Sequence, residues 1–470
     1  MEINEADIKQ IVERVIEKVA KQKKPEIKPL GSDCENEYGL FKTVEEAVKS
    51  AEKAFLELHR IPLEKRDNII AAMRDISRNN IESLAEDMEK ETGLGRAEDK
   101  KLKLKLAIEK TPGTEDIKPV VYSGDNGLTL IERAPYGVIG SITPVTNPVE
   151  TIINNSIGFV ASGNSAVFNA HPGSKRVSAK IIGLLNKAIQ TAGGPANLLC
   201  GVLEPEIESA KELMQNDSIR LLVVTGGEGV VKEAMKSGKK VIAAGPGNPP
   251  VVVDETADIP KAAQFIMEGA STDNNIICVQ EKEIIAVDAV VDELKEELIK
   301  NNGYEIKGYN IKKLEKLVVE GNGPNKKFVG KNASVILKGI GINVSDDIRL
   351  IIAEVDEMHP FVQNEMLMPV IGLVRMGNVD EAIGMAVRCE HGYRHTAVMH
   401  SKNIDNLSKM AKVMDTSIFV KNASSLTGLG HNGEGHTSYT IAGFTGEGLT
   451  SAKSFTRERR CVLKDHFRII

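Results

Sequence analysis

The sequence has no tryptophan and few aromatic residues of any kind. Only 4% of its 470 residues are aromatic, and this scarcity disfavours a platform on which single-stranded nucleic acid or a carbohydrate would stack. An excess of positive charge is also missing, since 60 Lys and Arg stand against 66 Asp and Glu, a formal net charge of −6. These charges are spread along the chain, so no nucleic-acid partner is expected. A small aliphatic substrate fits this composition better.

Cysteines are few, and long apolar runs are missing. The five cysteines lie far apart without a Cys-x-x-Cys pair, which disfavours a disulfide framework and a zinc site. His431 and His436 flank Glu434, but their spacing is not helical, and no metal site is predicted. No run approaches the roughly 18 apolar residues that cross a bilayer, and the acidic N-terminus lacks the layout of a secretory signal. We expect a cytoplasmic protein with no membrane partner.

The N-terminal residues carry an amphipathic pattern of their own. Apolar residues from Ile8 to Val19 recur at three- and four-residue spacing, which predicts a helix over residues 1–20 with one apolar stripe. Residues 21–38 have no periodicity and are predicted to form a linker. Two interpretations stay open: the helix packs on the body or on a second subunit, or it is a docking peptide.

After the predicted linker, the sequence first shows patterns that are typical of helices. The stretch from Thr43 to Glu46 is a capping-box pattern, which predicts a helix through Leu58. Two further helices are predicted over Leu63–Arg78 and Ile81–Glu91. From Gly137 onward, short β-rich runs are separated by helical segments such as Val177–Thr191.

A second region of alternating strands and helices runs from about Pro249 to Ser424. Because this alternation is typical of parallel sheets, we predict an α/β protein with two doubly wound domains. The strands expected in the second region lie near Glu283–Val287, Ile351–Glu354 and Val370–Val374.

One glycine-rich turn is a candidate nucleotide site. The stretch Val223–Gly229 has the form of a strand, a tight turn and a helix, in which glycines let the backbone approach a phosphate. The dinucleotide fingerprint Gly-x-Gly-x-x-Gly is absent, because the prolines that follow Gly247 prevent the helix that the motif needs. A purely structural turn stays open as the alternative.

Cys278 is a candidate nucleophile. It ends the polar stretch that begins at Asp273, and the β-rich run Glu283–Val287 follows. The mouth of a strand suits a nucleophile, but a free cysteine also packs as a small apolar core residue. The local pattern leaves both interpretations open.

Four motifs, in this order, resemble the aldehyde dehydrogenase superfamily. The resemblance is closest to its coenzyme A-acylating branch, the acetaldehyde, propionaldehyde and butyraldehyde dehydrogenases, and it covers the chain from about Tyr38 to Cys461. The stretches His391–Thr396 and Thr440–Gly448 are also similar to that branch. The four motifs are Ala134–Gly140, Thr143–Pro148, Gly245–Pro250 and Asn274–Cys278.

The resemblance implies an aldehyde dehydrogenase-like fold. It places a nucleotide-binding α/β domain over residues 39–248 and a catalytic α/β domain over 249–439. A small β extension, formed by residues 120–133 and the C-terminal return 440–470, is expected to join subunits into a dimer or tetramer.

The same resemblance assigns catalytic roles. Cys278 matches the thiol whose thiolate adds to an aldehyde; hydride then leaves to the nicotinamide. Asn147 matches the side-chain donor to the oxyanion, with the backbone N–H of Cys278 as its companion. An Asx turn before Pro148 is the structural alternative for Asn147. Glu365 matches the glutamate that hydrogen-bonds the nicotinamide ribose.

Further cofactor-binding residues are expected at the ends of strands. Hydrolytic relatives carry Lys-Pro-Ser where this chain has His171, Pro172 and Gly173, and this departure leaves the choice between NAD and NADP open. The predicted cofactor contacts besides Glu365 are Thr143, Pro144, His171, Pro172, Thr225, Gly226, Gly227 and Gly229.

One missing residue favours acyl transfer over hydrolysis. Hydrolytic relatives carry a glutamate that activates water, and the matching stretch Ala243–Asn248 has none. A general base contributes roughly 10²- to 10⁴-fold, so the thioester is expected to await coenzyme A as the co-substrate. Another glutamate could stand in, and a hydrolytic aldehyde dehydrogenase is the alternative.

More distant alternatives are a cysteine hydrolase and a non-enzymatic shell adaptor. The hydrolase would need a histidine base, and no histidine lies in a stretch that matches this role. Cys278 and Asn147 disfavour the adaptor. Several members of the acylating branch carry an N-terminal helix and linker that target them to bacterial microcompartments, so residues 1–20 are predicted to bind shell proteins. The chain length of the aldehyde stays open.

Overall fold

The computed structural model describes residues 38–470, which belong to one compact unit. The predicted N-terminal helix, and the linker up to residue 37, lie outside the described residues. Within 38–470, no helix is both long and apolar enough to cross a membrane.

The first half of the described chain forms a six-stranded parallel sheet of order β1-β6-β5-β4-β7-β8. Strands β4 and β5 are buried along their whole length, as expected for strands covered on both faces. The strands are β1 (Leu40–Phe41), β4 (Val138–Ile142), β5 (Ser165–Asn169), β6 (Leu199–Val202), β7 (Ile219–Thr225) and β8 (Lys240–Ala244).

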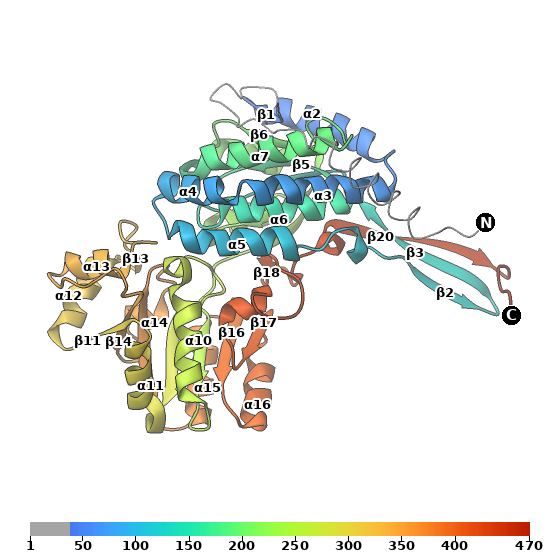
Figure 1. Ribbon diagram of the computed structural model, residues 1–470. Helices are drawn as coiled ribbons and strands as arrows, with labels where there is room; N and C mark the ends of the chain where they lie inside the picture. The colour runs from blue at the N-terminus through green and yellow to red at the C-terminus, as the bar shows by residue number, and fades with distance from the viewer. Residues whose placement is uncertain (1–37) are drawn as a thin grey trace, which may run out of the picture. The chain divides into compact units, whose positions relative to one another are not determined.

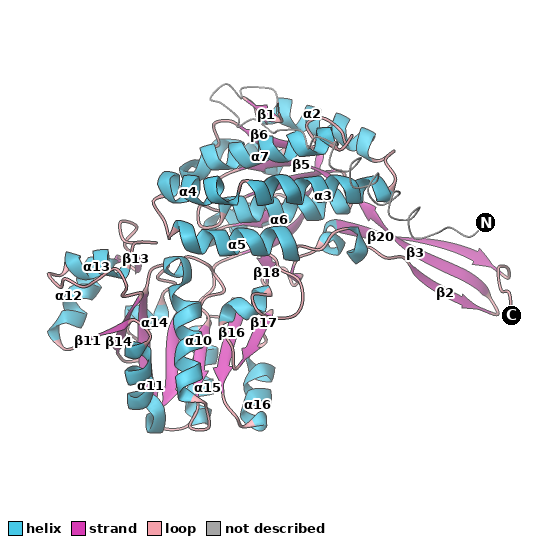
Figure 2. Ribbon diagram, viewed as in Figure 1, coloured by secondary structure: helices cyan, strands magenta, loops and turns pink. Residues whose placement is uncertain are grey.

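Helices cover both faces of this sheet (Figures 1 and 2). The capping box predicted at Thr43 is confirmed: its Oγ1 accepts from the Glu46 N–H at 3.2 Å, and its N–H donates to Glu46 Oε2 at 3.2 Å. One face carries α2 (Val44–Leu58), α8 (Ile207–Gln215) and α9 (Glu228–Met235). The other carries α3 (Leu63–Asn79), α4 (Ile81–Thr92), α5 (Ala97–Lys110), α6 (Pro148–Ala161) and α7 (Lys175–Thr191).

The second half forms a seven-stranded parallel sheet of order β11-β14-β15-β10-β9-β16-β17. All three strands predicted in this region are confirmed, the first of them with the bounds Glu283–Val287. The strands are β9 (Pro250–Val253), β10 (Glu283–Val287), β11 (Gly303–Ile306), β14 (Leu350–Glu354), β15 (Val370–Met376), β16 (Thr396–His400) and β17 (Ile418–Lys421).

Helices on opposite faces of the second sheet build two separate cores. One core includes α10 (Ile259–Ser271) and α11 (Asp288–Lys300). The other includes α15 (Val379–Cys389) and α16 (Ile404–Met414). A third core near the β11 edge includes α12 (Tyr309–Val318) and α13 (Ala333–Gly339). The remaining elements here are α14 (Pro360–Gln363) and the hairpin of β12 (Val319–Glu320) and β13 (Gly323–Pro324).

A small antiparallel sheet joins distant parts of the sequence. It consists of β2 (Val120–Gly124), β3 (Gly127–Pro135) and β20 (Thr456–Lys464), which run side by side in Figure 1. Of the predicted C-terminal segment, only β20 joins this sheet, because β18 (Ile441–Ala442) and β19 (Gly448–Leu449) pair with each other. The division of the chain into domains stays a prediction.

Candidate functional site

The residues predicted to bind the cofactor gather at one edge of the first sheet. Strand β4 lies between β5 and β7, and Ile142 pairs with Asn169 on one side and Val224 on the other. Because the strands are parallel, the segments that follow them, beginning at Thr143, Ala170 and Thr225, leave the sheet at the same edge. Helix α9 shares a core with α2 and α8 on one face, whereas α6 contacts α3 and α7 on the other. Such a reversal point is where nucleotides bind in doubly wound sheets.

This edge suits a dinucleotide. Thr143 is 2% exposed, and its hydroxyl has no hydrogen-bond partner within the described chain. At Gly227 and Gly229, where α9 begins, a Cβ would meet open space, so the backbone is free to face a ligand. Backbone N–H groups at a helix N-terminus attract phosphate. These residues therefore fit the nicotinamide dinucleotide implied by the resemblance.

The other predicted contacts have partners of their own at this edge. His171 is exposed, and its Nδ1 accepts from the Gly173 N–H at 3.0 Å; Pro172 begins the short 3₁₀ helix 172–174. The Thr225 hydroxyl bonds that of Thr440 at 2.8 Å, and the Gly226 N–H donates to the Ala244 carbonyl at 3.1 Å. Their cofactor roles, like those of Pro144 and the glycines, stay predictions.

The loop before Cys278 is strained. Three consecutive residues adopt positive φ angles: Asp273 (49°), Asn274 (54°) and Asn275 (63°). For residues other than glycine this conformation costs roughly 1–2 kcal/mol each, and such strain persists only where neighbouring groups hold it. The side chains of all three residues are buried and bonded.

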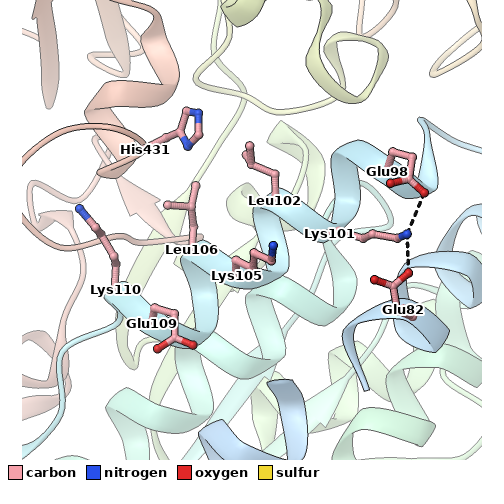
Figure 3. A pocket seen from close by; sticks show the side chains of 9 residues that line it. All are labelled: Glu82, Glu98, Lys101, Leu102, Lys105, Leu106, Glu109, Lys110 and His431. Atoms are coloured by element: carbon pink, nitrogen blue, oxygen red, sulfur yellow. Dashed lines mark hydrogen bonds and ion pairs between the residues drawn. The ribbon is translucent and has the colours of Figure 1, made fainter. Parts of the chain in front are cut away.

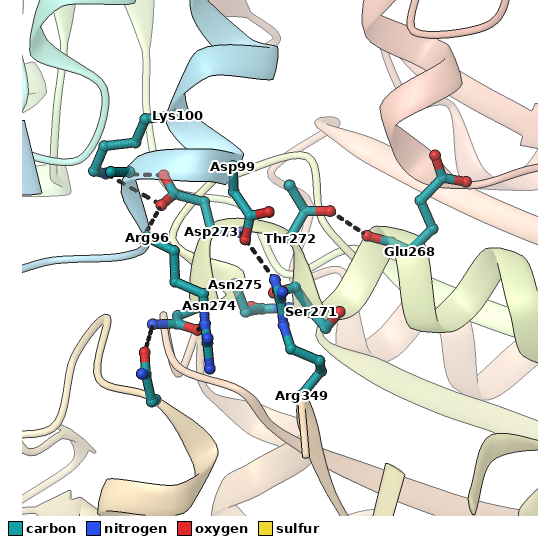
Figure 4. Close-up of polar contacts among 12 residues, drawn as sticks. Arg96, Asp99, Lys100, Glu268, Ser271, Thr272, Asp273, Asn274, Asn275 and Arg349 are labelled. Atoms are coloured by element: carbon teal, nitrogen blue, oxygen red, sulfur yellow. Dashed lines mark hydrogen bonds and ion pairs between the residues drawn. The ribbon is translucent and has the colours of Figure 1, made fainter. Parts of the chain in front are cut away.

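Asp273 fastens the loop to helix α5 (Figure 4). Its carboxylate accepts from the Arg96 N–H at 2.7 Å and from Lys100 Nζ at 3.0 Å, and it lies 2.5 Å from Lys103 Nζ. Gly95, at φ 72°, permits this approach, because a Cβ there would lie 1.8 Å from the carboxylate. Burial raises the pKa of Asp273, but Lys103 and Lys100 outweigh it, so the net pKa is lowered and the carboxylate is charged.

The two asparagines fasten the loop to the second sheet. Asn274 Nδ2 donates to the Gly330 carbonyl at 2.8 Å, and Asn275 Nδ2 donates to the carbonyls of Ala270 (2.8 Å) and Glu281 (2.9 Å). Lys282 adds a cation, since its Nζ donates to Asn275 Oδ1 at 2.6 Å. These contacts hold Cys278 in place from both sides of the loop.

The Cys278 thiol is partly exposed, and its surroundings keep it protonated at rest. The pKa of Cys278 is raised to about 12, first by burial and then by the charge of Glu365, although Lys282 and the backbone N–H groups of Cys278 and Val279 act in the opposite direction. Burial also raises the pKa of Glu365 to about 7. A nucleophilic role for Cys278 would therefore require removal of the thiol proton.

Gly247 and His395 complete the wall beside Cys278. A Cβ on Gly247 would lie 2.8 Å from the Cys278 carbonyl oxygen and 3.0 Å from His395 Cγ, so no side chain fits between them. Burial lowers the pKa of His395 to about 4, and its Nε2 has no partner within 38–470. Sequence reasoning found no histidine with a role at the thiol, because His395 is 117 residues from Cys278 (395 − 278) and only the packing brings them together.

Asn147 begins helix α6 without capping it. Its side chain makes no cap hydrogen bond, so the Asx-turn alternative raised from the sequence is wrong. Instead, Asn147 Oδ1 accepts from Lys103 Nζ at 2.7 Å, and Nδ2 lies 3.2 Å from the Thr146 hydroxyl. Because Lys103 also contacts Asp273, Asn147 and the loop that carries Cys278 share one buried cation.

A cavity of about 240 Å³ borders the thiol wall. It is lined by residues of both sheet regions, among them Gly245, Pro246, Tyr393, His395 and Phe444. A larger groove runs along the outer face of α5, where Lys101 pairs with Glu82 and Glu98 and His431 faces the helix (Figure 3). The smaller cavity shares His395 with the wall beside Cys278, whereas the groove shares no residue with that wall, so the smaller cavity is the candidate for chemistry.

Comparisons of the sequence and the structure with known proteins agree on one family. Residues 34–304 match the aldehyde dehydrogenase family. An acetaldehyde dehydrogenase (acetylating) from Bilophila wadsworthia is 49% identical over the full length of both chains.

Three solved structures are similar over most of the chain. A Rhodopseudomonas palustris propionaldehyde dehydrogenase with bound CoA and an acylated cysteine has a TM-score of 0.90 and 48% identity, and covers 91% of this chain and 98% of its own. A propionaldehyde dehydrogenase from the Clostridium phytofermentans fucose utilisation microcompartment has a TM-score of 0.91 and 47% identity, covering 92% and 100%. An engineered glycolyl-CoA reductase with bound NADP+ has the same TM-score, identity and coverage.

The influence of the Glu365 charge on Cys278 predicts a change in thiol reactivity. Above pH 7 the Glu365 carboxylate is charged and raises the pKa of Cys278, so Glu365→Gln is expected to lower that pKa. Each unit of pKa changes the thiolate fraction on the order of tenfold. The rate of alkylation of Cys278 by iodoacetamide at pH 8 is therefore expected to rise several-fold.

The control for this experiment is Glu228→Gln, an exposed carboxylate that lines the cavity of about 240 Å³. It is expected to leave the alkylation rate unchanged, and the Cys278→Ala variant gives the background from other cysteines. An unchanged or lower rate in Glu365→Gln would show that this carboxylate does not govern the thiol.

Proposed function

Because this chain belongs to the aldehyde dehydrogenase family, we propose that it oxidises a short-chain aldehyde with NAD(P)+ through a thioester on Cys278 and transfers the acyl group to coenzyme A. Family membership confirms the resemblance and the fold class predicted from the motifs. Acetaldehyde and propionaldehyde are the first candidate substrates, because they are named for the relatives above.

The chemistry assigns each step to a residue of the site. The Cys278 thiolate adds to the aldehyde carbon, and the Asn147 amide together with the Cys278 N–H donates to the resulting oxyanion. Bound at the edge of the first sheet, the nicotinamide dinucleotide would supply the hydride acceptor. The thiol of coenzyme A then attacks the thioester carbonyl, and Cys278 leaves as a thiolate.

The absence of a general base for water supports the proposal that coenzyme A, rather than water, accepts the acyl group. The stretch matching the hydrolytic glutamate ends β8 with Ala243 and Ala244, which are 0% and 3% exposed, and Gly247 then packs against Cys278 without room for a side chain. Glu365, whose charge acts on Cys278, is the candidate stand-in, but its predicted partner is the nicotinamide ribose. Without an activated water, the thioester lasts until a thiol reaches it.

The first test is NADH formation from propionaldehyde and NAD+ with and without coenzyme A, repeated with acetaldehyde and with NADP+. Sustained turnover is expected only with coenzyme A, with at most one NADH per Cys278 in its absence, and none in Cys278→Ala. Acyl-CoA is measured by mass spectrometry. Equal turnover without coenzyme A, with release of the free acid, would establish the hydrolytic alternative.

We also propose that the three-stranded sheet joins two copies of this chain. Its strand β2 exposes Val121 (54%) and Tyr122 (62%), and β20 exposes Val462 (61%). Apolar residues gathered on one exposed sheet are typical of an interface, and a self-complementary surface closes most simply as a dimer.

The double substitution Tyr122→Asp with Val462→Asp is expected to dissociate the oligomer, because charges replace apolar contacts that would be buried. Size-exclusion chromatography with light scattering gives the mass, and Glu132→Gln, an exposed polar position on β3, is the matched control. An unchanged mass in the double variant would exclude this sheet from the interface.

The predicted N-terminal helix gives a proposal about location. A similar chain belongs to a bacterial microcompartment, and residues 1–20 carry an apolar stripe of the kind that docks into a groove. We infer that this segment binds shell proteins and places the enzyme in the microcompartment lumen.

Deletion of residues 1–30 is expected to leave kcat unchanged and to remove the enzyme from purified microcompartments, as measured by immunoblot of the sedimented shells. A deleted protein that still cosediments would refute docking. A deleted protein that unfolds at lower temperature would instead support packing of the helix on the body.

A further inference from the structure

Helix α5 presents two lysines to the protein interior. Lys100 and Lys103 are each 1% exposed, and they face Asp273 and Glu150, which are each 0% exposed. Each lysine thereby lies against a buried carboxylate, which is how proteins accommodate ionisable groups in their interior. Neither lysine was singled out from the sequence.

Only one of these lysines reaches the oxyanion donor. Lys100 Nζ donates to both Asp273 oxygens, at 3.2 and 3.0 Å. Lys103 Nζ donates to Asn147 Oδ1 at 2.7 Å and lies 2.5 Å from Asp273 and 3.2 Å from Glu150. Burial lowers the pKa of Lys103, but these two carboxylates outweigh it, so the net pKa is raised and the ammonium stays charged.

The ammonium decides which way the Asn147 amide points. An ammonium has three N–H donors and no acceptor, so the atom that faces Lys103 must be the amide oxygen. The NH₂ group of Asn147 must then face the opposite side, without any need to observe hydrogens. A charge-assisted bond to the oxygen also polarises the amide and makes its N–H a stronger donor.

We propose that Lys103 is a positioning residue for the oxyanion: its ammonium fixes and polarises the Asn147 amide so that Nδ2 donates to the oxyanion formed on Cys278. This inference rests on the proposed function, in which Asn147 is the donor. The same ammonium contacts Asp273, five residues before Cys278 (278 − 273). The Lys103 ammonium thereby contacts both the proposed oxyanion donor, Asn147, and the loop that carries the proposed nucleophile, Cys278.

The backbone of Lys103 is held from the C-terminal part of the chain. The Tyr439 hydroxyl donates to the Lys103 carbonyl at 2.9 Å, and the Tyr439 N–H donates to Asn154 Oδ1 of helix α6 at 3.0 Å. Helices α5 and α6 are therefore bridged by Tyr439 on one side and by the contact of Lys103 with Asn147 on the other. The Lys103 ammonium itself is held by its burial and by its contacts with Asn147, Asp273 and Glu150.

A double-mutant cycle tests the coupling of Lys103 to Asn147. Removal of an oxyanion donor costs roughly 10²- to 10³-fold in kcat, so Asn147→Ala is expected to fall in that range. Lys103→Met is expected to lower the rate of the first NADH turnover roughly 10- to 100-fold with little change in the KM for NAD+. Because Lys103 acts through Asn147, the double variant is expected to be no slower than Asn147→Ala alone. Multiplicative losses would overturn the proposal.

Lys100→Met is the matched control. It removes the same buried charge and the same contact with Asp273 but leaves the bond from Lys103 to Asn147 in place. A structural role predicts equal losses of rate and thermal stability in both variants. The positioning role predicts comparable losses of stability, with a large loss of rate only in Lys103→Met. Equal losses of rate would therefore overturn the proposal.

A second variant guards against poor folding. Lys103→Met combined with Glu150→Gln removes one charge of each sign, which keeps the cluster neutral, and the same loss of rate is expected. The rate of alkylation of Cys278 by iodoacetamide needs no oxyanion and is expected to stay unchanged. A parallel fall in alkylation would place the effect on the Cys278 loop and refute the role at Asn147.

These outcomes are separate from those that test the proposed function. The cycle is measured on the first NADH turnover, which precedes acyl transfer. Whether turnover of the unmodified enzyme depends on coenzyme A shows which molecule accepts the acyl group. The coupling between Lys103 and Asn147 tests the positioning role, whether coenzyme A or water is the acceptor.

Discussion

The buried carboxylate of Asp273 is the contact on which the arrangement of the site depends. It sits in a loop of the second sheet region and binds the backbone N–H of Arg96 and the ammonium groups of Lys100 and Lys103 on α5. Breaking one partner of a buried ion pair is strongly destabilising, because the other charge is left without compensation. These contacts tie helix α5, which packs on α6 of the first sheet region, to the loop of the second region that carries Cys278.

The strain in this loop is concentrated next to the nucleophile. Three successive left-handed residues, 273–275, turn the chain sharply before Cys278, and each has a buried side chain that stabilises the turn. Lys282 contributes a cation from the other side. Strain of this kind is maintained where the surrounding structure over-determines the backbone, and here it fixes where the thiol and its N–H point.

The charged and polar groups around Cys278 determine whether it is a protonated thiol or a thiolate. Burial and Glu365 raise the pKa of Cys278, while Lys282 and two backbone N–H groups lower it. A buried amide, Asn147, faces a lysine whose charge is balanced by two carboxylates. In the proposed mechanism the donors are thus oriented before any negative charge develops on a substrate, which is the arrangement that lowers a barrier without reorganisation.

Local patterns in the sequence determined the capping box at Thr43, the strand Glu283–Val287 and the alternation of strands and helices. They also determined the motifs around Cys278 and Asn147. Each of these features depends on neighbours within a few residues. Only the tertiary structure decided which lysines of α5 are buried. In sequence, Lys100 and Lys103 resemble Lys101 and the exposed Lys105. Because charged residues are mixed with apolar ones along α5, the sequence pattern did not predict this helix. His395 likewise comes to lie beside Gly247, which also adjoins Cys278, only through packing. Burial and ion pairing depend on distant residues that the fold brings together, and no local pattern records them.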